Sequence, residues 1–299
     1  MIVFLGSPRG FCAGVVRAID SVDIALEKYG PPIYVKHQIV HNSYVVKQIE
    51  QKGAITVEKV SEIPEGSKVV FSAHGSAPED YIEAKTRNLH VLDATCPLVT
   101  KVHNEAKKYS KDGRKLILVG HEGHQEVIGT MGQEKMHLID DRKKNEDTLP
   151  SWQKDTPITI LTQTTLSEDD TQISISKIQK NFNNVVVKND ICYATTNRQN
   201  VVKKLSKMVD IILVIGSANS SNCNRLREVA ESYGVVAKLI NSPKQISKKW
   251  LQNVKNVGIT SGASTPEEQI DLVIDFLNPD KVIPIVGANE DISFKMPEI

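Results

Sequence analysis

The chain has 299 residues, and its 37 Lys and Arg balance 36 Asp and Glu, giving a formal net charge of +1. This balance argues against a broad basic surface, so we expect no nucleic-acid partner and no anionic membrane partner. Hydrophobic residues make up 40% of the chain, enough for a sizeable core. No apolar run is long enough to span a bilayer.

Short runs rich in Val, Ile and Leu alternate with amphipathic segments along the chain. The predicted strands are residues 2–5, 33–35, 68–72, 89–92, 115–119, 158–161, 184–187, 211–215, 236–240 and 257–260. The predicted helices include residues 15–28, 97–108, 169–181, 199–208, 224–232 and 266–277. This alternation indicates an α/β fold with mainly parallel sheets. The polar segment 140–155 is expected to be a surface loop or boundary.

Three of the four cysteines share one local context, directly after a predicted strand and directly before a predicted helix. Cys12, Cys96 and Cys192 are 84 and 96 residues apart, close to the length of one small α/β unit. The repeat predicts three similar modules in place of the two domains that the length alone suggests. Their boundaries are expected at residues 13–97, residues 98–190, and residues 1–12 with 191–277, with 278–299 as a C-terminal tail. Cys223 lies off the repeat, in a segment predicted to be a polar loop.

The three repeated cysteines admit several roles. A single Cys is commonly a small buried hydrophobe, but three in one repeated context make that role improbable for the set. Zinc sites usually show four ligands and paired spacings such as C-x₂-C, which the chain lacks. Three thiolates suit an iron–sulfur cluster that leaves one iron open for Lewis-acid chemistry.

Polar residues follow most of the predicted strands, where an open α/β sheet binds its ligands. Most are neutral hydrogen-bonding groups, which predict a phosphate-sized pocket. The polar residues that follow strands are His37, His41, Asn42, Ser72, His74, His121, His124, Thr165, Ser220, Ser221, Asn222, Ser264 and Thr265. Glu126 and Thr164 also follow strands, and a carboxyl group in such a pocket has a raised pKa and suits general acid catalysis.

The segment GFCAG around Cys12 also resembles the G-x-S-x-G nucleophile elbow, with cysteine as the nucleophile. A Cys hydrolase using His74 or His124 as the base is therefore an alternative. It ranks second because it leaves Cys96 and Cys192 unexplained.

Long ordered motifs give the chain a resemblance to a known family over residues 2–266. These motifs are SPRGFCAGV, HNSYVV, FSAHG, DATCPLVTKVH, GHEGHQEVIGTMGQ, TQTTLS, DICYATTNRQ, GSANSSNCNRL and SGASTP. Together they resemble the LytB family of 4-hydroxy-3-methylbut-2-enyl diphosphate reductases, the last enzymes of the non-mevalonate isoprenoid pathway.

The resemblance implies a trefoil of three α/β modules around a central [4Fe–4S] cluster. Cys12, Cys96 and Cys192 would hold the cluster, with its fourth iron open to substrate, and Cys223 would be an incidental loop thiol. Glu126 would supply a proton, and Thr164 would lie near the substrate hydroxyl. The diphosphate would be held by His41, His74, His124, Thr165, Ser220, Ser221, Asn222 and Ser264.

The implied reaction is reductive dehydroxylation to isopentenyl and dimethylallyl diphosphate. Ferredoxin or flavodoxin is the implied electron donor, and the chain is expected to act as a monomer. The start of the sequence lacks the marks of a secretory signal, so a bacterial cytoplasmic location is expected, with a mature plastid form as the alternative. A non-catalytic iron–sulfur sensor is a third class that the motifs leave open.

Overall fold

The computed structural model describes residues 1–143 and 149–298. The predicted segment 140–155 therefore lies partly outside the described residues. The described strands are β1 (Ile2–Ser7), β2 (Ile33–Lys36), β3 (Ala54–Val57), β4 (Lys68–Phe71), β5 (His90–Asp93), β6 (Lys115–Val119), β7 (Met136–Ile139), β8 (Ile158–Thr162), β9 (Val185–Val187), β10 (Ile211–Ile215), β11 (Val236–Ile240), β12 (Asn256–Ser261) and β13 (Lys281–Val286).

Helices alternate with these strands along the chain. They are α1 (Ala13–Tyr29), α2 (Ser43–Gln51), α3 (Pro78–Thr86), α4 (Pro97–Lys111), α5 (Gln125–Met131), α6 (Glu168–Asn181), α7 (Tyr193–Leu205), α8 (Ser221–Ser232) and α9 (Glu267–Leu277), with short 3₁₀ turns η1 (Val60–Glu62), η2 (Pro243–Gln245) and η3 (Lys248–Leu251).

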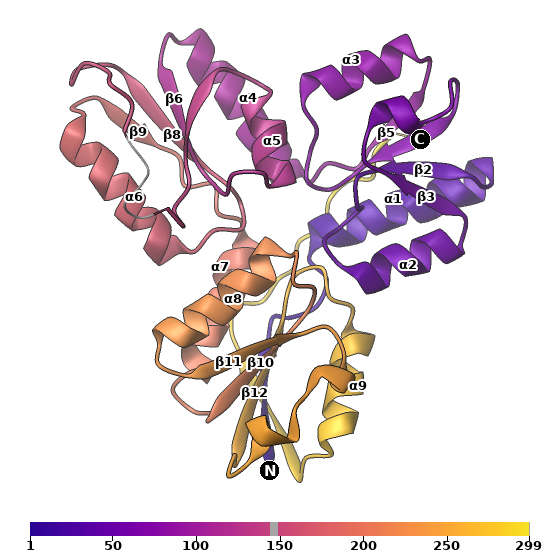
Figure 1. Ribbon diagram of the computed structural model, residues 1–299, viewed down its shortest axis with the longest axis vertical. Helices are drawn as coiled ribbons and strands as arrows, with labels where there is room; N and C mark the ends of the chain where they lie inside the picture. Colours follow the sequence, from indigo (N-terminus) through magenta and orange to yellow (C-terminus); the bar gives the residue numbers. More distant parts are fainter. Residues whose placement is uncertain (144–148, 299) are drawn as a thin grey trace. The chain divides into compact units, whose positions relative to one another are not determined.

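The strands form three sheets, and every strand pair in them is parallel. The strand orders are β11-β10-β12-β1-β13, β3-β2-β4-β5 and β7-β6-β8-β9. Three sheets, each with its own helices, confirm the predicted α/β class and the repeat of small modules (Figure 1).

The chain divides into two compact units. The first unit holds the five-stranded sheet and consists of Met1–Val16, His41–Lys47 and Cys192–Ser293. The second unit holds both four-stranded sheets and consists of Arg17–Val40, Gln48–Ile191 and Phe294–Ile299.

The five-stranded sheet of the first unit is covered on both faces, with α7 and α8 on one side and α9 on the other (Figure 1). Alternate residues of β10 belong to different cores. Ile211 and Leu213 pack with Ile270 of α9, whereas Ile212 and Val214 pack with the α7 and α8 side chains. A strand buried on both faces reads as a continuous apolar run, which explains why the sequence predicted β10 at its observed bounds.

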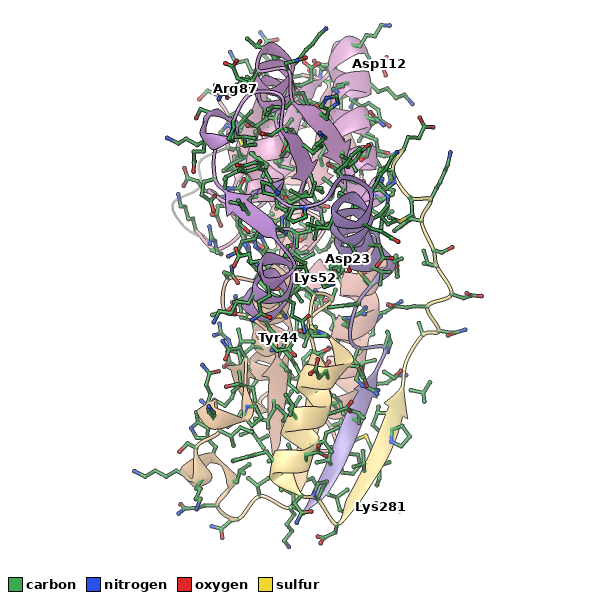
Figure 2. All side chains as sticks on the ribbon, turned by 90° about the vertical axis from the view of Figure 1, so that its right-hand side faces the viewer. Asp23, Tyr44, Lys52, Arg87, Asp112 and Lys281 are labelled. Carbon is green, nitrogen blue, oxygen red and sulfur yellow. The ribbon has the colours of Figure 1, made fainter. Side chains whose placement is uncertain are left out.

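In the second unit, exposed ionic contacts join elements at the surface. Lys52, directly after α2, forms an ion pair with Asp23 of α1, with Nζ 2.7 Å from Oδ1 (Figure 2). Because both side chains are solvent-exposed, this pair contributes at most about 1 kcal/mol to stability, and the apolar cores carry the fold.

Three strands were absent from the sequence prediction: β3, β7 and β13. The first two are edge strands of four residues that mix polar with apolar side chains, so they show no continuous apolar run. The third lies in the stretch expected to be a C-terminal tail and pairs with β1 at the edge of its sheet; Lys281 begins it (Figure 2). Pro284 is tolerated there because an edge strand has one side free of ladder hydrogen bonds.

Helix α7 begins six residues before its predicted start at residue 199. The prediction followed apolar spacing, which begins only at Val201. The first turns carry Thr195 and Arg198 instead, and both are buried. Because the buried residues at the start of this helix are polar, apolar spacing could not predict where it begins.

Candidate active site

Each of the three repeated cysteines lies at the start of a helix, as the sequence predicted. Cys96 is the N-cap of α4, Cys192 is the N-cap of α7, and Cys12 directly precedes α1. The structure records all four cysteines as thiols, and these three are partly exposed. Backbone N–H groups at a helix N-terminus stabilise negative charge and so oppose the effect of burial on a thiol.

Within the first unit, Tyr193 links two of these cysteine positions. Its hydroxyl accepts a hydrogen bond from the backbone N–H of Ala13 at 3.3 Å, so the residue after Cys192 binds the residue after Cys12. Burial raises the pKa of Tyr193 to about 12, and the nearby Cys12 and Cys192 thiols add to this effect. The first unit thus brings Cys12 and Cys192 to one place.

The Cys12 thiol is subject to opposing influences. Burial raises its pKa, while the backbone N–H of Val15 and the positive charge of Arg198 act in the opposite direction. The loop before it is anchored to the rest of the first unit, because the Cys12 N–H donates to the carbonyl of Ala263 at 3.1 Å.

Neutral polar groups gather at the N-terminus of α8. Ser220 is the N-cap, and its side chain accepts from the Cys223 N–H; Ser221 and Asn222 form the first turn. Asn222 is only 5% exposed, and in the described part of the chain its amide nitrogen and oxygen have no hydrogen-bond partner. An unpaired buried amide is costly, so Asn222 is suited to pair with a ligand.

The first unit also places His41 beside Ser264, whose hydroxyl donates to the His41 carbonyl at 3.2 Å. Asn42 follows His41 and is buried, with its Nδ2 donating to Gln269 Oε1 at 3.0 Å. The Asn42 side chain also accepts from the Tyr44 N–H at 2.9 Å, which caps α2 and fixes the backbone at His41.

Cys223 differs from the prediction of an incidental loop thiol. It lies in the first turn of α8 and is fully buried in the core with Val214 and Leu226. Its sulfur lies against the backbones of Gly216 and Gly262, where an added Cβ would come within 2.3 and 2.2 Å of it. The polar segment NSSNCN concealed the helix because its serines and asparagines cap and begin it.

In the second unit, Glu126 and Thr164 form a buried pair. The carboxylate accepts from the Thr164 backbone N–H at 2.6 Å and from the Thr164 hydroxyl at 2.9 Å. Glu126 is only 4% exposed and lies in the first turn of α5.

Burial raises the pKa of Glu126 to about 7, against the lowering effect of both Thr164 hydrogen bonds. The nearby carboxyl group of Asp190 adds a smaller raising effect. A large fraction of the Glu126 carboxyl groups is therefore protonated near neutral pH, as general acid catalysis requires.

His74 and His124 lie near each other in the second unit, with ring centroids 6.2 Å apart. His124 is the N-cap of α5, and its Nδ1 accepts from the Glu126 N–H at 3.2 Å. In a neutral imidazole this leaves the proton on Nε2, which makes that atom a donor for an anion. The Thr165 hydroxyl accepts a hydrogen bond from Nε2 of Gln163 at 2.9 Å.

Sequence reasoning missed Asp190, Tyr193 and Arg198, which lie in the DICYATTNRQ motif. Each is buried or half-buried and acts on a candidate site residue through charge or a hydrogen bond. Their closeness to Cys192 in the sequence was the one feature that could have marked them as candidate site residues.

Among the described residues, one group of potential metal ligands has its atoms within 4.8 Å of one another: His121, Asp140 and Asp141. Asp140 already accepts from the Arg142 guanidinium and from the Glu122 N–H. This group contains none of the predicted ligands, and its carboxylate contacts anchor the loop after β7.

The thiols remain the donor set for a cofactor. Three partly exposed thiols at helix starts fit an iron–sulfur cluster with one open iron. A structural zinc site usually has four protein ligands, and magnesium and calcium prefer oxygen ligands. In the described ranges, no helix is both long and apolar enough to span a membrane.

Comparisons with known proteins agree on one family. The chain is 51% identical to 4-hydroxy-3-methylbut-2-enyl diphosphate reductase 2 of Bradyrhizobium diazoefficiens, covering 99% of this chain and 98% of the relative. It is 49% identical to the reductase of the same name from Histophilus somni, covering 100% and 98%.

Among solved structures, E-1-hydroxy-2-methyl-but-2-enyl-4-diphosphate reductase from Plasmodium falciparum matches with a TM-score of 0.94 and 37% identity, covering 99% of this chain and 95% of that one. These relatives are named reductases, so the Cys-hydrolase alternative finds no support. The family model described as LytB protein matches residues 3–278. By this match and these identities, the chain belongs to the LytB family.

Proposed function

We propose that the chain catalyses the reductive dehydroxylation of 4-hydroxy-3-methylbut-2-enyl diphosphate to isopentenyl and dimethylallyl diphosphate. The full-length similarity to reductases that carry this name supports the reaction. The observation that carries the chemistry is the buried Glu126–Thr164 pair, a carboxyl group whose pKa is raised to about 7 with a hydroxyl in contact.

Cys12, Cys96 and Cys192 are proposed to hold a [4Fe–4S] cluster. When bound, such a cluster supplies electrons and, at an iron without a protein ligand, a Lewis-acid position for the substrate hydroxyl. The fit rests on three thiols at helix starts in one repeated context, two of which Tyr193 links.

The diphosphate is proposed to bind neutral polar groups that follow the strands. Asn222, with Ser220 and Ser221, offers a helix N-terminus and a buried amide that lacks a described partner. The other proposed binding residues are His41, His74, His124, Thr165 and Ser264. Neutral donors can surround the anion without adding net charge, in keeping with the balanced composition.

The proton path is proposed to run from Glu126 through the Thr164 hydroxyl to the substrate hydroxyl. The 2.9 Å contact between Thr164 Oγ1 and Glu126 Oε2 can carry the transfer, because a hydroxyl both accepts and donates. The C–O bond breaks and the hydroxyl leaves as water. Two electrons enter the allyl unit, and a second proton at either end of it gives one or the other product.

The electron donor is proposed to be ferredoxin or flavodoxin, and the active form to be a monomer. We also propose a cytoplasmic location, because four scattered cysteines in a chain of this length suit a reducing compartment better than a disulfide framework.

Anaerobic incubation of purified protein with 4-hydroxy-3-methylbut-2-enyl diphosphate and reduced methyl viologen tests the function. We expect isopentenyl and dimethylallyl diphosphate, together with visible iron absorbance. An iron-loaded protein that leaves the substrate unchanged would favour the sensor class. A colourless protein that acts in air and is inactivated by iodoacetamide at Cys12 would favour the hydrolase.

A further inference from the structure

Arg198 is a charged residue in the interior of the first unit. It lies in α7, is 0% exposed and is among the largest fully buried side chains. Its Nη1 donates to the Ala194 carbonyl at 3.0 Å, and its Nη2 donates to the Gly10 carbonyl at 2.9 Å. The guanidinium thus joins the loop before Cys12 to the helix that begins after Cys192.

Glu290 provides the opposite charge. Arg198 Nη1 lies 2.9 and 3.2 Å from the two carboxylate oxygens of Glu290, and Asn197 Nδ2 donates to Oε1 at 3.1 Å. Glu290 follows β13, so the C-terminal segment is held against α7. Three distant stretches of chain therefore meet at one buried guanidinium.

A buried ion pair is a weak source of stability, since removing two charges from water offsets much of their attraction. Apolar side chains of similar volume can often replace such a pair without loss. The position of this pair suggests a different purpose. The carbonyls that Arg198 binds belong to Gly10, two residues before Cys12, and to Ala194, two residues after Cys192.

We propose that Arg198 and Glu290 are positioning residues that hold Cys12 and Cys192 in place for a cluster, and that their charges set its reduction potential. The inference rests on the proposed function, because it assumes that these thiolates bind the cluster. A positive charge near a cluster favours its reduced, more negative form, and a negative charge disfavours it.

The test is a redox titration of anaerobically purified holoenzyme, followed by its visible and electron paramagnetic resonance spectra. Arg198→Gln is expected to shift the midpoint potential to more negative values and Glu290→Gln to more positive values. Arg198→Lys keeps the positive charge but loses the guanidinium that binds several acceptors at once. Its midpoint potential should therefore stay near that of the wild type, while the variant loses iron faster in air. Glu231→Gln, in an exposed ion pair of the same unit, is the matched control and should change neither.

Opposite shifts separate an electrostatic role from a structural one, because a loosened fold would move both variants in the same direction. If Arg198→Gln does not fold, the potential of Glu290→Gln still tests the electrostatic role. This variant should fold, because an amide of the same shape can keep a hydrogen bond to Arg198. An unmoved potential in Glu290→Gln, or shifts of the same sign in both, would overturn the inference while wild-type turnover leaves the proposed function intact. A wild-type protein that takes up no cluster would overturn both.

Discussion

Asn222 in the first unit and Glu126 in the second are almost equally buried, but they differ in their hydrogen bonding. The amide of Asn222 has no described hydrogen-bond partner, whereas both oxygens of Glu126 are engaged by Thr164. An unpaired amide gains by binding a ligand, while a satisfied carboxyl group in an apolar setting is tuned to hold a proton. The contrast supports the proposed binding role of Asn222 and the proposed proton transfer by Glu126.

The cysteines differ between the units as well. The first unit brings Cys12 and Cys192 together through Tyr193, whereas Cys96 lies in the second unit at the start of α4. A cluster that needs all three should be lost when the second unit's thiol is removed.

The largest effect is expected for Cys96→Ser. Serine is a poor ligand for iron, so visible absorbance and turnover should fall to background. Iron and sulfide analysis of anaerobically purified protein measures this. Full iron content in this variant would remove Cys96 from the ligand set.

Glu126→Gln should lower kcat by about 10²- to 10⁴-fold, because it removes the transferable proton while an amide can still bond with Thr164. The dissociation constant for substrate, measured by calorimetry, should stay near wild type. Glu134→Gln, whose carboxylate accepts from Ser110, is the matched control and should keep wild-type turnover. A Glu126→Gln enzyme with nearly normal kcat would exclude this residue from the proton path.

Asn222→Ala should raise KM by roughly 10- to 100-fold, about 1.4 to 3 kcal/mol of binding, with a smaller change in kcat. The same change removes two unpaired buried atoms, so the free energy of unfolding without ligand should rise by about 1 kcal/mol.

Asn224→Ala is the control on the same helix, since its amide donates to the carbonyls of Ala218 and Ser220. Its KM should stay unchanged while its stability falls. An Asn222→Ala variant that is less stable and binds substrate normally would mean that Asn222 is structural.

The smallest effect is expected for Cys223→Ala. Iron content and kcat should stay within about twofold of wild type, because the sulfur packs in the core. The void left beside Gly216 and Gly262 should lower the free energy of unfolding by about 1 kcal/mol, measured by urea unfolding. Loss of iron in this variant would show that the fourth cysteine serves the cofactor.

The sequence predicted elements well where burial was uniform. β6 and β10 are apolar throughout or nearly so and were placed at their observed bounds. The edge strands β3 and β7 were not predicted, because polar residues interrupt their apolar runs. The start of α7 was not predicted either, because its buried residues are polar. Apolar periodicity carries no information about such polar contacts.

The candidate site residues could be selected from sequence because they follow strands. Their supporting contacts could not, since Arg198 and Glu290 are 92 residues apart and meet only in the folded chain. The raised pKa of Glu126 was expected in direction from its setting, but its cause, burial opposed by Thr164, required the structure.

The pH dependence of kcat/KM tests the central claim, that a protonated Glu126 donates the proton, most directly, because kcat/KM reports the groups of the free enzyme. Because the pKa of Glu126 lies at about 7, its protonated form prevails below that pH and is lost above it. With limiting substrate and excess reduced methyl viologen, kcat/KM should be level well below pH 7 and fall about tenfold per pH unit well above it. The residual activity of Glu126→Gln should lack this fall. A wild-type kcat/KM that stays constant or rises between pH 7 and 9 would contradict the account.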